Sequence, residues 1–198
     1  SFAGEEAGIT AVHIAPERSK RFDVIHCHGL YPTGSRELES WTWGANARVI
    51  DALVGAYGVT VPSPWVAELL QRDMGIRPDI VPHGINLKEW PKREEPPKRP
   101  VVLWNKNRPD DVCDPAPVIH LAGKHPDVPF ASTFGEERDN LRITGTMSHE
   151  EMKKLLYRCG IYFSSTKETF GIGMLEAFAA GLPVLGWRWG HAPELVEH

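Results

Sequence analysis

A strand–helix–strand pattern near the carboxyl end most constrains how this chain can fold. The apolar residues 160–165 predict a buried strand, and a glycine-rich loop follows them. Helical apolar spacing begins at Met174 and ends at Gly181 and Pro183, because glycine suits a left-handed helix end and proline cannot continue a helix. A second apolar run begins at Val184. This order predicts a βαβ unit, and therefore a parallel sheet.

Two acidic residues frame this loop, with seven residues between them. We expect Glu168 in the loop at the carboxyl end of the strand, and Glu176 in the first or second turn of the helix. Exposed N–H groups at a helix start form a site for phosphate. The peptide N–H groups predicted to point out of the helix are those of Gly171, Ile172, Gly173 and Met174. Carboxylates beside a phosphate site suit a sugar nucleotide, whose hydroxyls donate to them.

The stretch E-T-F-G-I-G-M-L-E-A-F-A-A-G-L-P-V resembles the E-x7-E signature of the family-4 retaining glycosyltransferases. Its glycines, its L-E-A-x-A-x-G-x-P-V tail and its flanking strands lie where that family has them. The resemblance covers most of residues 22–198 and is most specific from about 140 to 195. It implies an α/β protein of the GT-B type, with two Rossmann-like parallel-sheet domains facing a cleft. The alternative is a plain Rossmann-like βαβ unit.

Length and composition are those of an ordinary globular protein. The chain has 198 residues, 41% apolar and 24% charged, which is enough for one or two domains. A net charge of −4 indicates no general affinity for nucleic acid or membranes. No window approaches the ~18 apolar residues of a membrane span. The cysteines lie far apart in the sequence, which indicates free thiols in a reducing compartment and predicts a cytoplasmic protein. They are Cys27, Cys113 and Cys159.

Residues 1–85 are predicted to form a partial acceptor-side domain. Within it, residues 22–28 resemble the D-V-I-H-x-H strand of the family's first domain. His28 should end this strand and face the cleft as a catalytic residue; the alternative is a histidine that only caps the strand. His26 shares a strand face with His28, so a metal site is possible on spacing. The sequence positions no third ligand, and we predict no metal.

A proline-rich stretch is predicted to separate the two domains. Ser63 and Pro64 predict a helix start in the first domain. His83 takes the place of the asparagine in the family's N-G-V-D turn. Residues 86–100 have a linker composition, and residues 101–198 should form a truncated donor-binding domain.

The loop after the predicted strand 100–104 departs from the family pattern. Family members have a G-R pair there and a lysine about five residues on, which together clamp the donor diphosphate. Here Lys106 stands at the arginine position and Asp111 where the lysine is expected. Since an acid cannot pair with phosphate, Arg108 is the substitute cation. The alternative is a solvated charged loop.

A third loop is expected to contact the nucleobase. Thr146 should lie at the start of a segment whose backbone reads the base in the family. The S-x-x-E pattern from Ser148 to Glu151 predicts a capping box at the next helix.

The resemblance implies a retaining glycosyltransferase, of the hexosyltransferase class, that uses a UDP-, GDP- or ADP-sugar. Glu176 would bind the ribose and Glu168 the sugar hydroxyls, while the helix amides with Lys106 or Arg108 stabilise the leaving diphosphate. No metal or cofactor is obligatory, and the leaving phosphate is a candidate for accepting the acceptor's proton; Glu168 as a nucleophile is the weaker alternative. The acceptor is a carbohydrate, a lipid or a small molecule, and no nucleic acid is expected.

Two other functions stay open at this point. Because family members have a longer first domain and more chain after the second motif, we expect a fragment or a shortened relative. A non-catalytic module that binds a nucleotide or nucleotide sugar is therefore the first alternative. A dinucleotide-binding Rossmann enzyme is the second, but no G-x-G-x-x-G follows an early strand.

Overall fold

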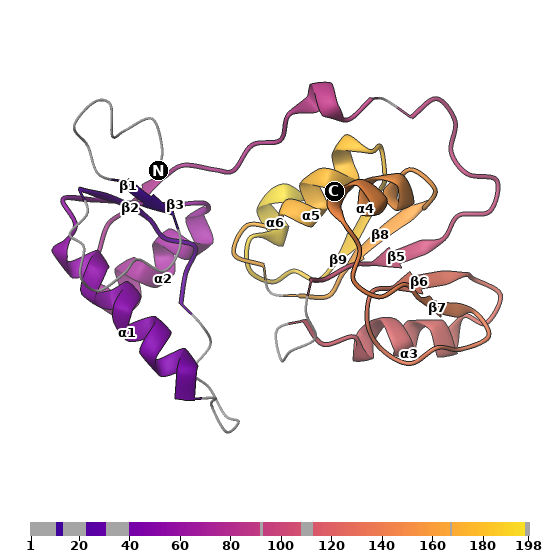
Figure 1. Cartoon of the computed structure of the whole chain (residues 1–198), viewed down its shortest axis with the longest axis horizontal. Coiled ribbons are helices and arrows are strands. Elements are labelled where there is room, and N and C mark those ends of the chain that lie inside the picture. The colour runs from indigo at the N-terminus through magenta and orange to yellow at the C-terminus, as the bar shows by residue number, and fades with distance from the viewer. Residues whose placement is uncertain are drawn as a thin grey trace. The chain divides into compact units, whose positions relative to one another are not determined.

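The computed structural model describes residues 11–13, 23–30, 40–91, 93–107, 113–166 and 168–196. The chain divides into two compact units, Ser1–His83 and Gly84–His198. Each unit contains one sheet, and the strands within each sheet pair in parallel (Figure 1). The predicted α/β architecture with two Rossmann-like parallel sheets is confirmed.

The first unit has a four-stranded sheet in the order β1-β2-β3-β4. Ile25 and Val61 pack from the sheet against the apolar sides of α1 and α2. Ser63 caps α2 as predicted, since its hydroxyl accepts a hydrogen bond from the Val66 N–H at 3.2 Å. The elements are β1 (Ala11–His13), β2 (Val24–His26), α1 (Ser40–Gly55), β3 (Gly58–Val61), α2 (Pro64–Met74) and β4 (Asp79–Ile80).

The second unit has a five-stranded sheet in the order β7-β6-β5-β8-β9. It begins with a short 3-10 helix, η1 (Leu87–Glu89). Its strands are β5 (Val102–Trp104), β6 (Phe130–Ser132), β7 (Leu141–Ile143), β8 (Ile161–Ser164) and β9 (Val184–Gly186). Its helices are α3 (Ala116–Lys124), α4 (His149–Leu156), α5 (Ile172–Ala179) and α6 (Ala192–Leu195).

Helices cover both faces of the second sheet, and the central strand β5 is apolar and buried at every position. Leu103 and Tyr162 point to the face covered by α4 and α5. Trp104 and Phe163 point to the opposite face, where they pack with residues of α3. Alternate side chains of one strand thus enter two cores, which is the arrangement expected of a parallel sheet buried on both sides.

The capping box and the terminal glycine predicted from the sequence are both present at helix ends in the structure. Ser148 and Glu151 form the complete capping box at α4. Gly181 follows α5 with a φ of 75°, a left-handed conformation that glycine adopts without strain. The start of α5 differs, because the helix begins at Ile172, two residues before the predicted Met174. The short helix α6 was not predicted.

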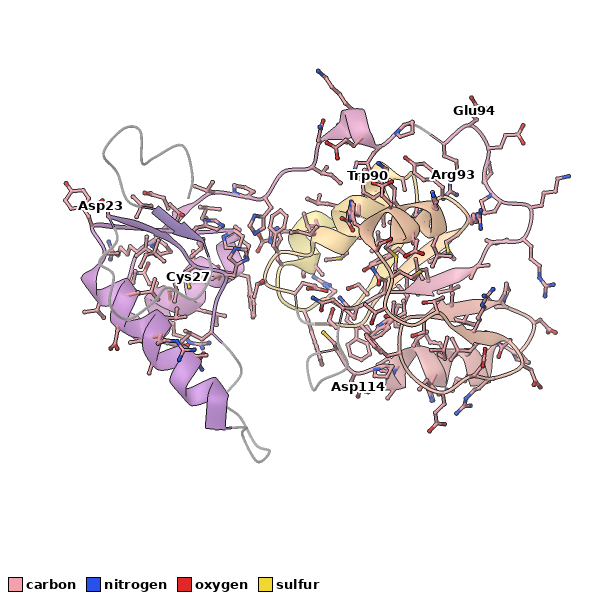
Figure 2. All side chains as sticks on the ribbon, viewed as in Figure 1. Asp23, Cys27, Trp90, Arg93, Glu94 and Asp114 are labelled. Carbon is pink, nitrogen blue, oxygen red and sulfur yellow. The ribbon has the colours of Figure 1, made fainter. Side chains whose placement is uncertain are left out.

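The predicted linker at 86–100 belongs to the second unit and is partly packed onto it. Trp90 is 5% exposed and lies in the core cluster formed with α4 and α5 (Figure 2). Its ring stacks near Tyr157, and the Lys153 Nζ atom lies 5.2 Å from its centre. The composition predicts a semi-rigid linker, but a buried tryptophan anchors this segment in the core of the second unit.

Arg93 fixes the same segment to the end of α4. Its guanidinium donates to the carbonyl oxygens of Leu156 at 3.1 Å and Cys159 at 2.8 Å. The last carbonyls of a helix have no partner within it, and a cation suits this end of the helix dipole. Arg93 therefore acts as a C-terminal cap supplied from a distant part of the sequence.

We expect Trp90→Ala to lower the free energy of unfolding by about 3–5 kcal/mol, because it leaves a cavity in the core. Leu87→Ala, on the same segment, is the matched control, since Leu87 is 67% exposed. Its effect should stay within about 0.5 kcal/mol. Urea denaturation measures both variants. Equal, small effects would mean that the segment is not anchored in the core.

Candidate functional site

The strand order of the second sheet creates a reversal point between β5 and β8. From β5 the chain proceeds to β6 and β7 on one side, and then crosses to β8 and β9 on the other. Open α/β sheets bind ligands outside the carboxyl ends of the strands at such a point. Lys106 follows β5 and Glu168 follows β8, so both lie at this edge.

Lys106 and Glu168 form a largely buried ion pair there. The lysine Nζ donates to Glu168 Oε1, and their side chains are 10% and 25% exposed. The Thr166 hydroxyl donates to the same carboxylate oxygen at 2.5 Å. Burial raises the pKa of Glu168, but the charge and hydrogen bond of Lys106, together with Thr166, outweigh it and hold the pKa below its ordinary value. Glu168 is therefore an anion at neutral pH.

The loop after β9 holds the backbone of Glu168 in place. The His191 N–H donates to the Glu168 carbonyl at 3.0 Å. Gly190 has a φ of 59°, and a Cβ added to it would overlap with the same carbonyl oxygen. The rings of Phe170 and His191 stack at 5.1 Å. Only glycine at 190 allows the two loops to approach this closely.

The glycine loop leads directly into α5. Gly171 adopts a φ of 95° immediately before the helix. The Met174 N–H donates to the Gly171 carbonyl at 3.0 Å, so this amide already has an acceptor within the protein. A Cβ at Gly173 would overlap with the Tyr162 hydroxyl. The first turn of α5 thus presents backbone without side chains at Gly171 and Gly173, beside the Lys106–Glu168 pair, with Ile172 between them.

Glu176 lies in the second turn of α5, as predicted, and its side chain is 15% exposed. Burial raises the pKa of this carboxyl, and the nearby His149 partly offsets the rise. The His149 Nδ1 atom lies 3.6 Å from Glu176 Oε1. The sequence placed His149 only inside a capping box, and nothing in its spacing from Glu176 indicates the contact.

Thr146 is an exposed residue in the loop between β7 and α4. His149 follows this loop in the chain and contacts Glu176, so the end of the loop lies near the site. Two residues named in the sequence analysis, Arg108 and Asp111, lie outside the described residues.

His28 lies in the first unit, half-buried, just after β2. Its ring stacks on His83 with centres 4.7 Å apart and meets the edge of His26 at 5.1 Å. β2 ends at His26, two residues before the predicted strand end at His28, and the rings of His26 and His83 lie beside His28.

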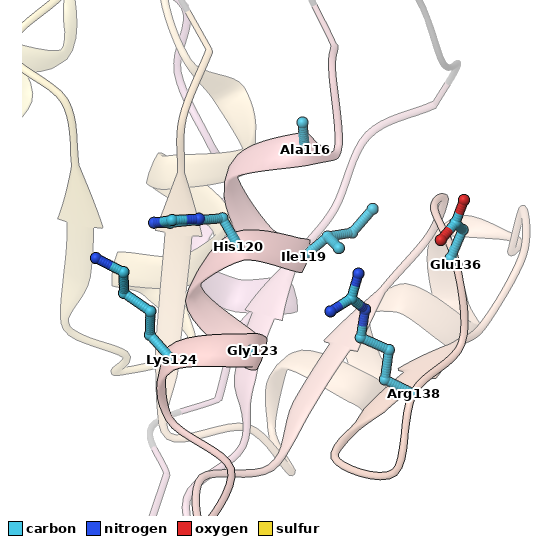
Figure 3. Close-up of a pocket in the computed structure, with 7 residues that line it drawn as sticks. All are labelled: Ala116, Ile119, His120, Gly123, Lys124, Glu136 and Arg138. Atoms are coloured by element: carbon cyan, nitrogen blue, oxygen red, sulfur yellow. The ribbon is translucent and has the colours of Figure 1, made fainter.

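Two hollows occur elsewhere among the described residues of the second unit. One, of about 480 Å³, lies between α3 and the crossover from β6 to β7, with His120, Lys124 and Arg138 among its lining residues (Figure 3). The other, of about 540 Å³, is lined mainly by apolar residues that include Phe163 and Trp187. Neither lining includes the residues at the reversal point.

One protein-family model matches part of the second unit. Residues 130–198 match the sequence model of the family described as Glycosyl transferases group 1. This segment runs from β6 to α6 and contains both glutamates of the site. A search of curated proteins finds no match to the chain.

Solved structures show the same arrangement of strands and helices. The structure of Anabaena Alr3699/HepE in complex with UDP-glucose superposes with a TM-score of 0.68 at 19% identity, over 88% of this chain and 56% of that one. A glycosyltransferase from Rickettsia africae ESF-5 gives 0.67 at 17% identity, over 98% and 62%. The GtfA/B complex gives 0.52 at 16% identity, over 85% and 38%. The likeness to these structures shows an α/β fold of the GT-B type. The chain spans between 38% and 62% of the length of these neighbours.

None of the described helices is both long and apolar enough to cross a membrane.

We expect the Lys106–Glu168 pair to show a coupling energy of about 0.5–3 kcal/mol in a double-mutant cycle with Lys106→Met and Glu168→Gln. Because the pKa of Glu168 is lowered on folding, its contribution is complete above the ordinary value of 4.5 and is lost as pH falls through the folded value. Urea denaturation from pH 7 downward measures the coupling. The exposed pair Arg72–Asp73 is the matched control and should couple less strongly. A coupling that persists unchanged in strong acid contradicts the assignment.

We expect Gly190→Ala to cost about 1–3 kcal/mol of stability, because alanine adds left-handed strain and a clash with the Glu168 carbonyl. Gly55→Ala is the control, because no atom lies within 4 Å of an added Cβ there. It should be neutral or slightly stabilising at this helix end. Thermal unfolding compares the two, and a harmless Gly190→Ala would show that the loops are not in close contact.

Proposed function

We propose that the second unit binds a nucleotide-diphosphate sugar and that the protein transfers the sugar to an acceptor hydroxyl with retention of configuration. The observation that carries the proposal is the buried Lys106–Glu168 pair at the sheet reversal, beside the start of α5 and Glu176. The group 1 match over residues 130–198 supports it. So does the neighbour whose structure contains UDP-glucose.

The diphosphate fits the start of α5. A helix N-terminus carries a partial positive charge and donates backbone N–H groups, both of which favour phosphate. Gly171 and Gly173 have no side chains, so phosphate oxygens can approach the backbone closely. Of the four amides, those of Gly171, Ile172 and Gly173 are the proposed donors, since the Met174 amide already has an acceptor.

The ribose fits Glu176. Its largely buried carboxylate lies one turn further along α5, and ribose hydroxyls would donate to it. The Nδ1 atom of His149 lies 3.6 Å from this carboxylate. The loop at Thr146 that leads to His149 is the proposed contact for the base.

The ion pair has a different role once the donor is bound. The Lys106 ammonium would turn from Glu168 to the diphosphate, where it stabilises the charge that grows on the leaving group. Glu168 is then able to accept hydrogen bonds from sugar hydroxyls near the reacting carbon, held by Thr166 and by the loop after β9. Arg108, from the same loop as Lys106, is the proposed second cation.

The reaction breaks the bond between the anomeric carbon and the diphosphate oxygen and forms a bond from that carbon to the acceptor oxygen. The acceptor's hydroxyl proton passes to the leaving phosphate oxygen. Retention follows if both bonds lie on the same face of the sugar. The protein's contribution is charge stabilisation and orientation, and no covalent intermediate with Glu168 is needed.

We expect calorimetry to show binding of UDP, GDP or ADP, with UDP tested first because of the neighbour with UDP-glucose. Glu176→Ala should weaken the binding by about tenfold to a hundredfold, the size of a hydrogen bond to a charged group. Glu150→Gln is the control, an exposed acid on α4 that should bind as the wild type does. Unchanged affinity in Glu176→Ala would remove the ribose assignment.

We expect Glu168→Gln to retain nucleotide binding, because the Lys106 ammonium stays available, and to lose about a hundredfold or more of the donor turnover. Turnover is monitored as the release of nucleoside diphosphate from a sugar donor that carries the nucleotide found to bind in the calorimetry. Lys106→Met should weaken both binding and turnover. Binding by the wild type without any turnover would favour a nucleotide-sugar-binding module.

A further inference from the structure

Three histidines converge at one edge of the first unit's sheet. His26 ends β2, His28 follows it, and His83 follows β4. One potential ligand atom from each lies within 4.8 Å of the others. Among the residues that the structure describes, this is the group of histidine, cysteine and acidic side chains with the spacing of a metal site.

The sheet holds these residues together across an intervening strand. β2 pairs with β3, and His26 lies opposite Thr60 in that register. β3 then pairs with β4, which leads to His83. Parallel strands end at the same edge, so residues far apart in the sequence meet there. Ile25 and Cys27 point into the core with α1 and α2, which leaves His26 on the opposite face.

Thr60 orients the first histidine. The Nδ1 atom of His26 lies 2.8 Å from the Thr60 hydroxyl oxygen. If the imidazole donates this hydrogen bond, its Nε2 atom carries the lone pair. A ligating histidine commonly donates its other ring N–H to an oxygen in this way, which sets the tautomer and the ring orientation.

We propose that His26, His28 and His83 bind a divalent transition-metal ion, with Zn²⁺ as the best-suited ion. Three neutral imidazoles are an established ligand set for zinc, and water or an added ligand completes the fourth position. Zinc–nitrogen bonds of about 2.0–2.1 Å place tetrahedral ligand atoms about 3.3 Å apart. Side-chain rotation can close the ligand atoms from within 4.8 Å to this spacing, because His28 and His83 lie beyond the strand ends.

The environment also suits a cation. All three side chains are half-buried, so an ion can enter while the cluster is shielded from part of the solvent. A metal would link the ends of β2 and β4 across β3 and would stabilise the folded unit. His28 then acts as a ligand instead of the catalytic residue predicted from the sequence. This inference does not depend on sugar transfer.

The test uses the full chain, stripped with a chelator and then titrated with Zn²⁺ against a chromophoric indicator. We expect one ion per chain and a rise in melting temperature. His83→Asn and His28→Asn should each weaken binding at least about tenfold and lose the thermal shift. Thr60→Val should weaken binding about tenfold to a hundredfold while the stoichiometry stays the same. His120→Asn, an exposed histidine of the second unit, should bind as the wild type does.

Co²⁺ gives an independent readout that needs no variant. A nitrogen-ligated, four-coordinate Co²⁺ has intense visible bands, and these should appear in the wild type and be displaced by Zn²⁺. A wild type that binds no Zn²⁺ overturns the proposal. So does a folded His83→Asn or His28→Asn variant that binds it as tightly as the wild type. If both variants fail to fold, missing Co²⁺ bands in the wild type still overturn it.

Discussion

The parallel pairing of β5 with β8 is the constraint on which the second unit depends. Its register joins Val102 to Ile161 and Leu103 to Tyr162. This pairing brings together two loops that are 62 residues apart, measured from Lys106 to Glu168. Leu103 is fully buried, as is Trp104 on the opposite face, so the position of β5 is set by two cores at once. The loop that carries Lys106 therefore follows a strand that is buried on both faces.

A buried ion pair between two loops carries a large desolvation free energy. Removing two charges from water costs several kcal/mol, and only close contact with additional hydrogen bonds offsets the cost. Glu168 has such support from Thr166, while Lys106 has its backbone N–H fixed by the Thr133 hydroxyl at 2.9 Å. In the proposed function, this arrangement assists binding of the anionic ligand. The Lys106 ammonium is already desolvated and oriented before it contacts the diphosphate.

Glycines in the second unit are required by their neighbours as much as by their own backbone angles. A side chain at Gly173 would overlap with Tyr162 of β8, and one at Gly190 with the backbone of Glu168. Gly171 combines a left-handed φ with close contact to Met174. The close contacts at Gly171, Gly173 and Gly190 restrict the path of the loop after β8. They explain why the acidic residue in this loop is fixed in position although it lies outside any regular element.

Signals within a few residues of one another determined much of the fold. Strand periodicity, the cap at Ser63, the capping box at Ser148 and the helix end at Gly181 each depend on hydrogen bonds or backbone angles nearby in the chain, and the structure has all of them. The positions of Glu168 and Glu176 relative to the loop and the helix followed from the same local rules.

Contacts between distant segments were decided by the tertiary structure alone. They include the anchoring of Trp90 and Arg93, the approach of His149 to Glu176, and the direct pairing of Lys106 with Glu168. His83 joined His26 and His28 only because β4 lies two strands from β2 in the sheet. Strand order is set by packing of the whole sheet and helices, and no local pattern encodes it. The sequence by itself thus determined which elements form, while the order in which they pack decided which side chains meet.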